Sequence, residues 1–294
     1  MASRWFAVEA GLSVMDRYAV VGQPVAHSRS PYIHAYFAKQ TEQQLEYGRL
    51  APHSDQFEQC VKDFFNNGGK GLNITLPFKE RAYLLAKQVS ARAKTAHAAN
   101  TLWIEDGQIC ADNTDGLGLT ADFNYLNIPI TKKSILILGA GGAVRGVLAP
   151  LLEQSPSEIF VANRTATKAI ELIKDFQGEN NTGNSIIHAG SIMDPRLSRS
   201  FDVIINATSA TIKGEALIFP QNIFSSNSYA YDMSYKAELT PFLEQARMHK
   251  VQHYFDGLGM LIEQAAESFR IWRHCRPKTD ELRILLRQQL INNS

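Results

Sequence analysis

The chain has 294 residues, of which 45% are hydrophobic and 20% charged, with a net charge of +1 at pH 7; this length exceeds one small core and fits two domains or one large one. The near-neutral charge, without a local cluster of Lys or Arg, argues against nucleic acid and against an anionic membrane surface as partners. Three widely spaced cysteines, Cys60, Cys110 and Cys275, form neither a disulfide framework nor a metal knuckle and indicate a reducing compartment, for which we expect the cytoplasm.

The first fourteen residues lack the features of a targeting segment. They contain one Arg, one Glu and only short apolar runs, so neither a signal peptide nor a membrane span fits them. No later stretch approaches the length of a span. Because the ordered pattern begins only at Tyr18, we expect residues 1–14 to be a disordered or frayed leader.

The front half of the chain alternates between strand and helix patterns. Ser30 and Pro31 predict a helix start, with Ser30 as the N-cap and Pro31 at the first helical position. Asn67-Gly68-Gly69 ends a helix, and Glu105-Asp106-Gly107 is typical of a hairpin turn. We expect strands at 18–22, 45–50, 71–76, 101–104 and 108–111, and helices at 53–66, 77–87, 91–99 and from Gly116 to about 126.

The run SILILGAGGAVRG at 134–146 opens the back half. Four apolar residues predict a strand buried on both faces, and Gly139, Gly141 and Gly142 then allow a tight turn into a helix. The helix N-terminus and its dipole would face a diphosphate that no side chain obstructs. Val144 stands where the common dinucleotide fingerprint has its third glycine, so a glycine-rich turn of another kind of α/β protein stays open on this stretch alone.

Strands and helices alternate strictly after that turn, which is typical of a parallel sheet with helices on both faces. The tail then adds helices without a strand. We expect strands at 158–162, 186–189, 202–207, 229–233 and 251–255, and helices at 143–154, 166–176, 241–249, 258–273 and 279–290.

The second strand of this half ends in Asn163-Arg164-Thr165. An NAD-binding unit would place an acidic residue there to bind the ribose hydroxyls. Thr165 is typical of an N-cap, which puts Arg164 and Lys168 at the positive end of a helix, where a bound anion would favour them. The 2′-phosphate of NADP is such an anion, and Arg can grip it with two hydrogen bonds. Two solvated cations on a surface turn are the alternative.

Lys79 poses a similar question in the front half. It lies in the first turn of a predicted helix, where a protonated ammonium is disfavoured, so it could exchange a proton with a substrate. Asp115 in the turn DNTDG is a candidate partner that the sequence alone cannot bring into contact. A solvated lysine and an N-cap aspartate before Gly116 are the alternatives.

Other polar side chains could meet a hydroxylated ligand, although caps and helix flanks explain several of them equally well. They are Ser28, Ser30, Asn73, Thr75, Asn100 and Gln264. His249 and His253 are four residues apart, but a strand boundary between them argues against a metal site, and we expect no metal.

Ten motifs in order resemble the shikimate dehydrogenase family over nearly the whole chain, from Tyr18 to about Leu290. They are VGQPVAHSRSPYIH, GLNITLPFKE, AANTL, DNTDGLG, LGAGGAVRG, NRT, INATS, YDMSY, TPFL and DGLGMLIEQA. The resemblance implies an α/β fold of two domains: a substrate domain at 15–115 completed by C-terminal helices at 258–294, and a Rossmann-like, doubly wound NADP domain at 116–257. It also implies NADPH-dependent reduction of 3-dehydroshikimate to shikimate in aromatic amino acid biosynthesis, by a monomer or homodimer.

The resemblance assigns roles residue by residue. Lys79 and Asp115 would be the catalytic pair. The substrate would be bound by Ser28, Ser30, Asn73, Thr75, Asn100 and Gln264, with Tyr235 close by. The cofactor would be bound by Gly139, Ala140, Gly141, Gly142, Ala143, Asn163, Arg164, Thr165 and Lys168, with Thr208, Met233, Gly257 and Met260 near the nicotinamide.

Two departures from the family pattern stand out. His97 replaces the usual glycine before AANT, and the INATS segment continues as Ala210-Thr211-Ile212, without its usual glycine. Quinate/shikimate dehydrogenase is an alternative, against which Ser30 and Arg164 argue, because those enzymes often favour NAD and replace the second serine by threonine. A catalytically silent NADP-binding homologue is another, against which the intact Lys79 and Asp115 argue.

Overall fold

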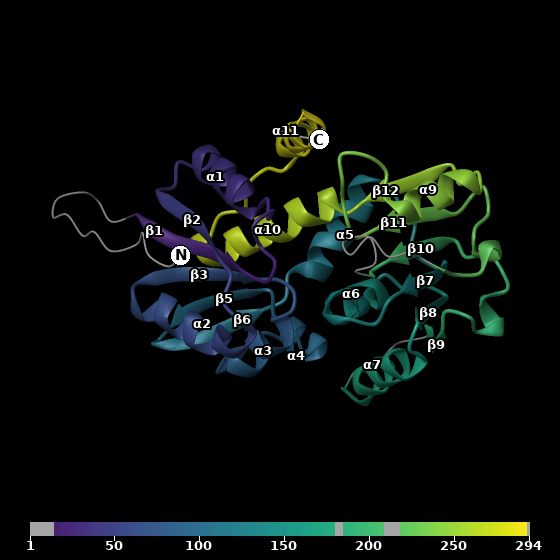
Figure 1. Cartoon of the computed structure of the whole chain (residues 1–294), viewed down its shortest axis with the longest axis horizontal. Helices are drawn as coiled ribbons and strands as arrows, with labels where there is room; N and C mark the ends of the chain where they lie inside the picture. The colour runs from purple at the N-terminus through teal and green to yellow at the C-terminus, as the bar shows by residue number, and fades with distance from the viewer. Residues whose placement is uncertain (1–14, 180–184, 209–217, 293–294) are drawn as a thin grey trace.

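A computed structural model describes residues 15–179, 185–208 and 218–292 of the chain. These residues form two six-stranded sheets, each with its own helices, and two long helices run between the sheets (Figure 1). The predicted leader at 1–14 lies outside the described residues.

The front sheet is mixed and has the strand order β2-β1-β3-β5-β6-β4. Its first three strands are parallel, β5 is antiparallel to both its neighbours, and β4 pairs parallel with β6. Its strands are β1 (Asp16–Val21), β2 (Leu45–Leu50), β3 (Gly69–Ile74), β4 (Gln88–Val89), β5 (Thr101–Glu105) and β6 (Gln108–Asp112).

Period-two alternation along β3 sends its side chains to two different cores. Leu72 and Ile74 pack with the helices α2, α3 and α4 on one face. On the other face, a Cβ at Gly71 would collide with the ring of Trp272, and Asn73 donates a hydrogen bond to Ser268. Trp272 and Ser268 both belong to helix α10 (Leu258–Arg273). The helices of this unit are α1 (Ser30–Gln40), α2 (Phe57–Asn66), α3 (Lys79–Leu85) and α4 (Ala91–Ala96), with a 3₁₀ turn at Ser54–Gln56.

The back sheet is parallel throughout, with the order β12-β11-β10-β7-β8-β9. This is the doubly wound order, in which the chain reverses direction across the sheet between β7 and β10 and leaves a ligand crevice at their carboxyl ends. Its elements are β7 (Ser134–Leu138), α6 (Gly142–Glu153), β8 (Glu158–Asn163), α7 (Ala166–Glu179), β9 (Ile186–Ser191), β10 (Val203–Asn206), β11 (Tyr229–Asp232), α9 (Pro241–Met248) and β12 (His253–Asp256), with 3₁₀ turns at Pro195–Leu197 and Gln221–Ile223.

Helices α5 (Asp115–Tyr125) and α10 (Leu258–Arg273) join the two units, and α10 carries the chain back across the front sheet (Figure 1). They pack so closely that a Cβ at Gly118 would lie 2.7 Å from the Cβ of Gln264. The last helix, α11 (Asp280–Asn292), is bonded to both through Arg283, whose guanidinium lies 2.5 Å from Asp122 and 2.9 Å from Glu263. Helix α11 is therefore held against both of the joining helices.

The predicted fold class is confirmed, and the structure corrects three helix starts. Ser30 is the first residue of α1 rather than its N-cap, because Arg29 occupies the cap position. The helix expected to start at Pro77 begins at Lys79. Asp115 is the first residue of α5 and Thr114 is the cap, so the N-cap reading of Asp115 is wrong. The short edge strand β4 was not predicted.

Over the described ranges, none of the helices combines the length and the apolar character that crossing a bilayer requires.

Candidate active site

Lys79 and Asp115 meet between the two sheets. The Nζ atom of Lys79 lies 2.5 Å from Oδ2 of Asp115, and only 15% and 6% of the two side chains are exposed. Each is the first residue of its helix, α3 and α5. The backbone of Lys79 is held as well, because the Ala99 N–H donates to its carbonyl at 2.9 Å. The structure therefore shows the contact between Lys79 and Asp115, which could not be predicted from the spacing of the two residues in the sequence.

Asn100 connects this pair to α10. Its Nδ2 donates to Oδ1 of Asp115 at 2.9 Å and lies 3.1 Å from Oε1 of Gln264. One carboxylate oxygen of Asp115 thus faces an amide and the other faces the ammonium of Lys79. Gln264, from the far end of the sequence, is brought to the same place as the predicted residues of the front half.

Asn73 lies behind these groups and is 6% exposed. Its Nδ2 donates to Ser268 Oγ at 2.9 Å, and its Oδ1 accepts from the Tyr47 hydroxyl at 2.7 Å and from His34 Nε2 at 3.1 Å. Burial lowers the pKa of His34 to about 3, against the opposing hydrogen bond to Asn73, so the ring is neutral. Burial also raises the pKa of Tyr47.

The two serines lie at the start of α1. Ser28 Oγ lies 3.2 Å from Ser30 Oγ and accepts a hydrogen bond from the Ser30 N–H at 3.3 Å. Thr75 follows β3, and its N–H donates to Val21 O at 2.9 Å, beside the loop that carries the serines. Tyr235, in the loop after β11, packs on the apolar cluster of α1 and α10, and burial raises its pKa.

The glycine turn between β7 and α6 has the predicted form. Gly139 has a φ of +115°, and a Cβ there would lie 3.0 Å from Ala207 O. Gly141 is the N-cap of α6, without a side-chain cap, and a Cβ added to it would meet no atom of the described residues within 4 Å. A Cβ on Gly142 would lie 3.9 Å from the Cβ of Lys79. The turn, which includes Ala140 and Ala143, is thus adjacent to the Lys79–Asp115 pair.

The other predicted cofactor residues follow the carboxyl ends of the parallel strands, where doubly wound folds bind ligands. Thr208 follows β10, and its N atom would lie 3.3 Å from a Cβ on Gly139. Met233 follows β11 and Gly257 follows β12, and a Cβ on Gly257 would collide with the Met233 carbonyl. Met260, on α10, is 7% exposed and shares a core cluster with Met233 and Ala140.

The residues expected at the adenosine end lie where β8 meets α7. Asn163 Nδ2 donates to Thr165 O at 3.0 Å, which tightens the turn. Arg164 precedes α7, Lys168 lies in the first turn of α7, and both are exposed to solvent. Together with the open space over Gly141, this edge fits a phosphorylated dinucleotide, because the turn leaves room for a diphosphate at a helix N-terminus and places cations near it.

His97 adopts a backbone shape that favours glycine. It ends α4 with φ 47° and ψ 32°, in the left-handed region that glycine adopts most easily, and its N–H donates to Lys94 O at 3.1 Å. The histidine therefore costs about 1 kcal/mol of backbone strain. The second departure, Ala210-Thr211-Ile212, lies outside the described residues.

Sequence reasoning missed several buried groups of this site. Thr101 is part of the motif AANTL, and Ser268 is one helical turn beyond Gln264, so both stood beside residues already singled out. Both are fully buried and lie 2.8 Å apart through their hydroxyls. Nothing in the sequence singled out His34 or Tyr47 as site residues, beyond the position of His34 in a predicted helix and of Tyr47 in a predicted strand.

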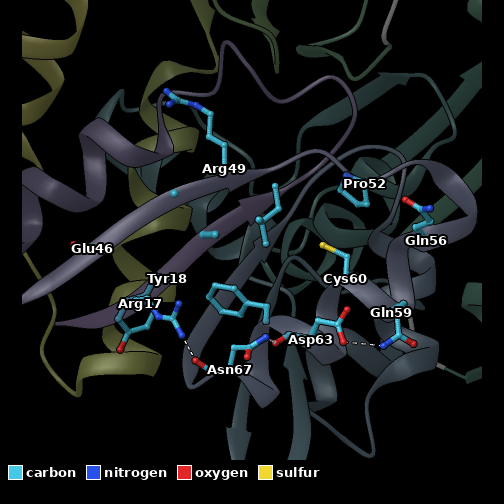
Figure 2. A pocket seen from close by; sticks show the side chains of 14 residues that line it. Arg17, Tyr18, Glu46, Arg49, Pro52, Gln56, Gln59, Cys60, Asp63 and Asn67 are labelled. Atoms are coloured by element: carbon cyan, nitrogen blue, oxygen red, sulfur yellow. Dashed lines mark hydrogen bonds between the residues drawn. The ribbon is translucent and has the colours of Figure 1, made fainter. Parts of the chain in front are cut away.

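A pocket of about 630 Å³ lies elsewhere, on the face of β1 and β2 next to α2. Figure 2 shows Cys60, Asp63 and Arg17 among the side chains around it. None of the predicted site residues lines it. In the described part of the chain, no group of three or more His, Cys, Asp or Glu side chains is arranged to hold a metal ion.

These features define a two-domain α/β protein with a nucleotide-binding type of sheet and a polar site at the join. The chain matches three family models: the shikimate dehydrogenase substrate binding domain at 20–102, shikimate/quinate 5-dehydrogenase at 124–220, and the shikimate 5′-dehydrogenase C-terminal domain at 257–283. It belongs to the shikimate dehydrogenase family.

Relatives match over almost their whole length. A protein of Nitrosomonas europaea named shikimate dehydrogenase (NADP(+)) is 48% identical over 280 residues, which cover 94% of this chain and 98% of that protein. One of the same name from Chromobacterium violaceum is 46% identical, covering 94% and 99%. Shikimate 5-dehydrogenase from Thermus thermophilus, solved with NADP(H) and shikimate, is 30% identical with a TM-score of 0.82, covering 94% of this chain and all of that one.

Proposed function

We propose that this protein is an NADP-dependent shikimate dehydrogenase, which interconverts 3-dehydroshikimate and shikimate in aromatic amino acid biosynthesis. The observation that carries the proposal is the buried contact of Lys79 with Asp115 next to the glycine turn of the other unit. An acid/base pair and a dinucleotide-binding turn are the two parts that such a reaction needs. The relatives of 45–48% identity that bear this name support the same reaction.

When bound, NADPH supplies the hydride that reduces the ketone. Lys79 donates the proton that the developing alkoxide requires, and Asp115 either orients the ammonium or relays the proton. In the oxidative direction Lys79 takes the hydroxyl proton back. Such acid/base assistance accelerates a reaction by roughly 10²–10⁴-fold. Enclosure of the pair between two units limits water and fixes the substrate against it.

The residues proposed to bind the substrate fall into groups according to their position in the site. Ser28 and Ser30 would bind from the start of α1, while Asn100 and Gln264 would bind from the side of the catalytic pair. Thr75 and Tyr235 would close the remaining sides, and Asn73 would support them from behind. Gly139 to Ala143 would hold the diphosphate of NADP. Arg164 and Lys168 would bind the 2′-phosphate, with Asn163 and Thr165 shaping the turn.

The proposal extends to the organisation of the chain. Residues 15–115 and 258–294 would form the substrate domain and residues 116–257 the NADP domain. The protein would act in the cytoplasm as a monomer or homodimer, on a small-molecule substrate.

The test is to mix purified protein with shikimate and NADP⁺, and to follow reduced nicotinamide by its absorbance. We expect turnover with this pair, and weak turnover when NAD⁺ replaces NADP⁺ or quinate replaces shikimate. Faster turnover of quinate with NAD⁺ would favour a quinate/shikimate dehydrogenase. A lack of turnover with every pair would favour a catalytically silent homologue.

A further inference from the structure

Five consecutive hydrogen bonds lead from β2 to the catalytic pair. They join Tyr47 Oη to Asn73 Oδ1 at 2.7 Å, Asn73 Nδ2 to Ser268 Oγ at 2.9 Å, Ser268 Oγ to Thr101 Oγ1 at 2.8 Å, Thr101 Oγ1 to Asn100 Oδ1 at 2.9 Å, and Asn100 Nδ2 to Asp115 Oδ1 at 2.9 Å. The five residues from Asn73 to Asp115 are each at most 6% exposed. They come from β3, α10, β5, the loop before β5 and the first residue of α5, so the series ties separate elements together.

The orientation of both amides in this series is fixed by backbone groups. The N–H of Thr114 can only donate, and it lies 2.9 Å from Oδ1 of Asn100, so the oxygen of that amide must face it. Nδ2 of Asn100 then faces Asp115. In the same way the carbonyl of Asn100 can only accept, and it lies 3.2 Å from Nδ2 of Asn73.

The hydroxyls of Thr101 and Ser268 join the two amides. Oδ1 of Asn100 accepts only, so the Thr101 hydroxyl donates to it at 2.9 Å. The Thr101 and Ser268 hydroxyls lie 2.8 Å apart, and the Gln264 carbonyl, whose two lone pairs can accept from Thr114 and Ser268 together, is a second acceptor for the Ser268 proton. Thr101 therefore contacts Asn100 directly, and Ser268 supports Thr101 from α10.

We propose that Thr101 and Ser268 are positioning residues, which act together with the Thr114 N–H to hold the Asn100 amide so that it donates to Asp115 and keeps the carboxylate aligned with Lys79. This inference rests on the proposed function. Hydrogen bonds linked in series polarise one another, so each strengthens the next. Because Ser268 lies on α10, the series also connects that helix to the catalytic pair.

Thr101→Val is the most direct test, because it removes the hydroxyl and keeps the shape of the side chain. We expect kcat to fall about tenfold, the effect of one hydrogen bond in an enclosed site. The Kd for NADP⁺ should change less than about twofold, since the cofactor would lose no contact. Thr101→Ser restores the hydroxyl and should recover most of the wild-type kcat.

A double-mutant cycle tests whether the two hydroxyls act as one unit. Because Ser268→Ala interrupts the same series, the variant with both substitutions should have nearly the same kcat as Thr101→Val alone. Thr120→Val is the matched control, since its hydroxyl bonds the carbonyls of Gly116 and Leu117 within α5. We expect it to have wild-type kcat, with thermal unfolding measured for every variant.

A wild-type kcat in Thr101→Val, no recovery in Thr101→Ser, or losses that multiply in the double variant would each overturn the proposal while leaving the proposed function intact. A crystal structure of Thr101→Val shows the position of the Asn100 amide directly. It therefore tests the proposal even if the protein is inactive. We expect Nδ2 of Asn100 to leave hydrogen-bonding distance of Asp115. An unchanged contact between Asn100 and Asp115 would contradict the inference.

Discussion

Lys79 and Gly142 come from helices of different units, yet a methyl group on Gly142 would lie 3.9 Å from the Cβ of Lys79. Lys79 begins a helix of the front unit, and Gly142 begins a helix of the back unit. The two helices thus start at the same place, one with a proton donor and the other with free backbone N–H groups for a phosphate. The account of the enzyme depends on this proximity.

Lys79→Ala should lower kcat by about 100-fold or more, because it removes the proton donor. The KM for shikimate should change modestly, since other side chains bind the substrate. Steady-state kinetics with NADP⁺ in excess measure both values. Lys62→Ala, on an exposed face of α2, is the control. An equal loss in both variants would argue against a catalytic role of Lys79.

Gly141→Ala separates cofactor binding from folding. A Cβ at this position meets no atom of residues 15–179, 185–208 and 218–292 within 4 Å, and the backbone is extended with φ −105°, so these residues tolerate alanine. The added methyl group occupies the space expected for the diphosphate. We predict an unchanged melting temperature and a Kd for NADP⁺ raised about tenfold or more, by fluorescence titration. Tight NADP⁺ binding in this variant would place the diphosphate elsewhere.

Arg164→Ala should weaken NADP⁺ and leave NAD⁺ nearly unaffected. A guanidinium that grips the 2′-phosphate has no counterpart in NAD⁺, and its loss should raise the Kd for NADP⁺ about tenfold. Calorimetric titration with each cofactor measures the difference. Lys174→Ala removes an exposed cation from α7, the helix that follows Arg164, and serves as the control. Equal weakening of both cofactors would contradict the assignment to the phosphate.

His34 should make the protein less stable in mild acid. Its pKa is about 3 in the folded protein because of burial, and about 6.5 when unfolded. The unfolded chain therefore binds the proton first, and stability that is complete above about pH 6.5 is lost progressively as the pH falls towards 3. Between pH 7 and pH 5 this amounts to about 2 kcal/mol.

The check is urea unfolding of the wild type and His34→Gln at pH 7 and pH 5. The fall in unfolding free energy should be about 2 kcal/mol smaller in the variant, which has no ring to protonate. Other groups contribute to both proteins alike and cancel in the comparison. The same fall in both proteins would show that His34 is not buried in its neutral form.

Patterns of neighbouring residues in the sequence predicted most of the helices and strands of the fold. The apolar run and three glycines at 134–142 predicted β7, its turn and α6, because each element there depends on neighbouring residues. Helix starts were less secure. Ser30 followed by Pro31 is an equally good pattern for a cap and for a first turn, and the structure has Ser30 in the first turn.

Contacts between distant residues could not be predicted from spacing. Lys79 and Asp115 are 36 positions apart, and Asn73 and Ser268 are 195 apart, so only the fold brings them together. The family resemblance supplied the first pair as a hypothesis. The resemblance made no assignment for Thr101 or Ser268. The role of their hydroxyls depends on hydrogen bonds to several partners, which can be identified only in the folded structure.

The most direct measurement is a crystal structure with both shikimate and NADP⁺ bound. We predict that one shikimate hydroxyl lies about 3 Å from Nζ of Lys79, the reach of a proton transfer, with the cofactor held by the Gly139–Ala143 turn. The shikimate carbon that bears this hydroxyl should face the nicotinamide of the cofactor. Shikimate bound with Lys79 turned to solvent, or with no hydroxyl shared between Lys79 and the cofactor side, would contradict the account.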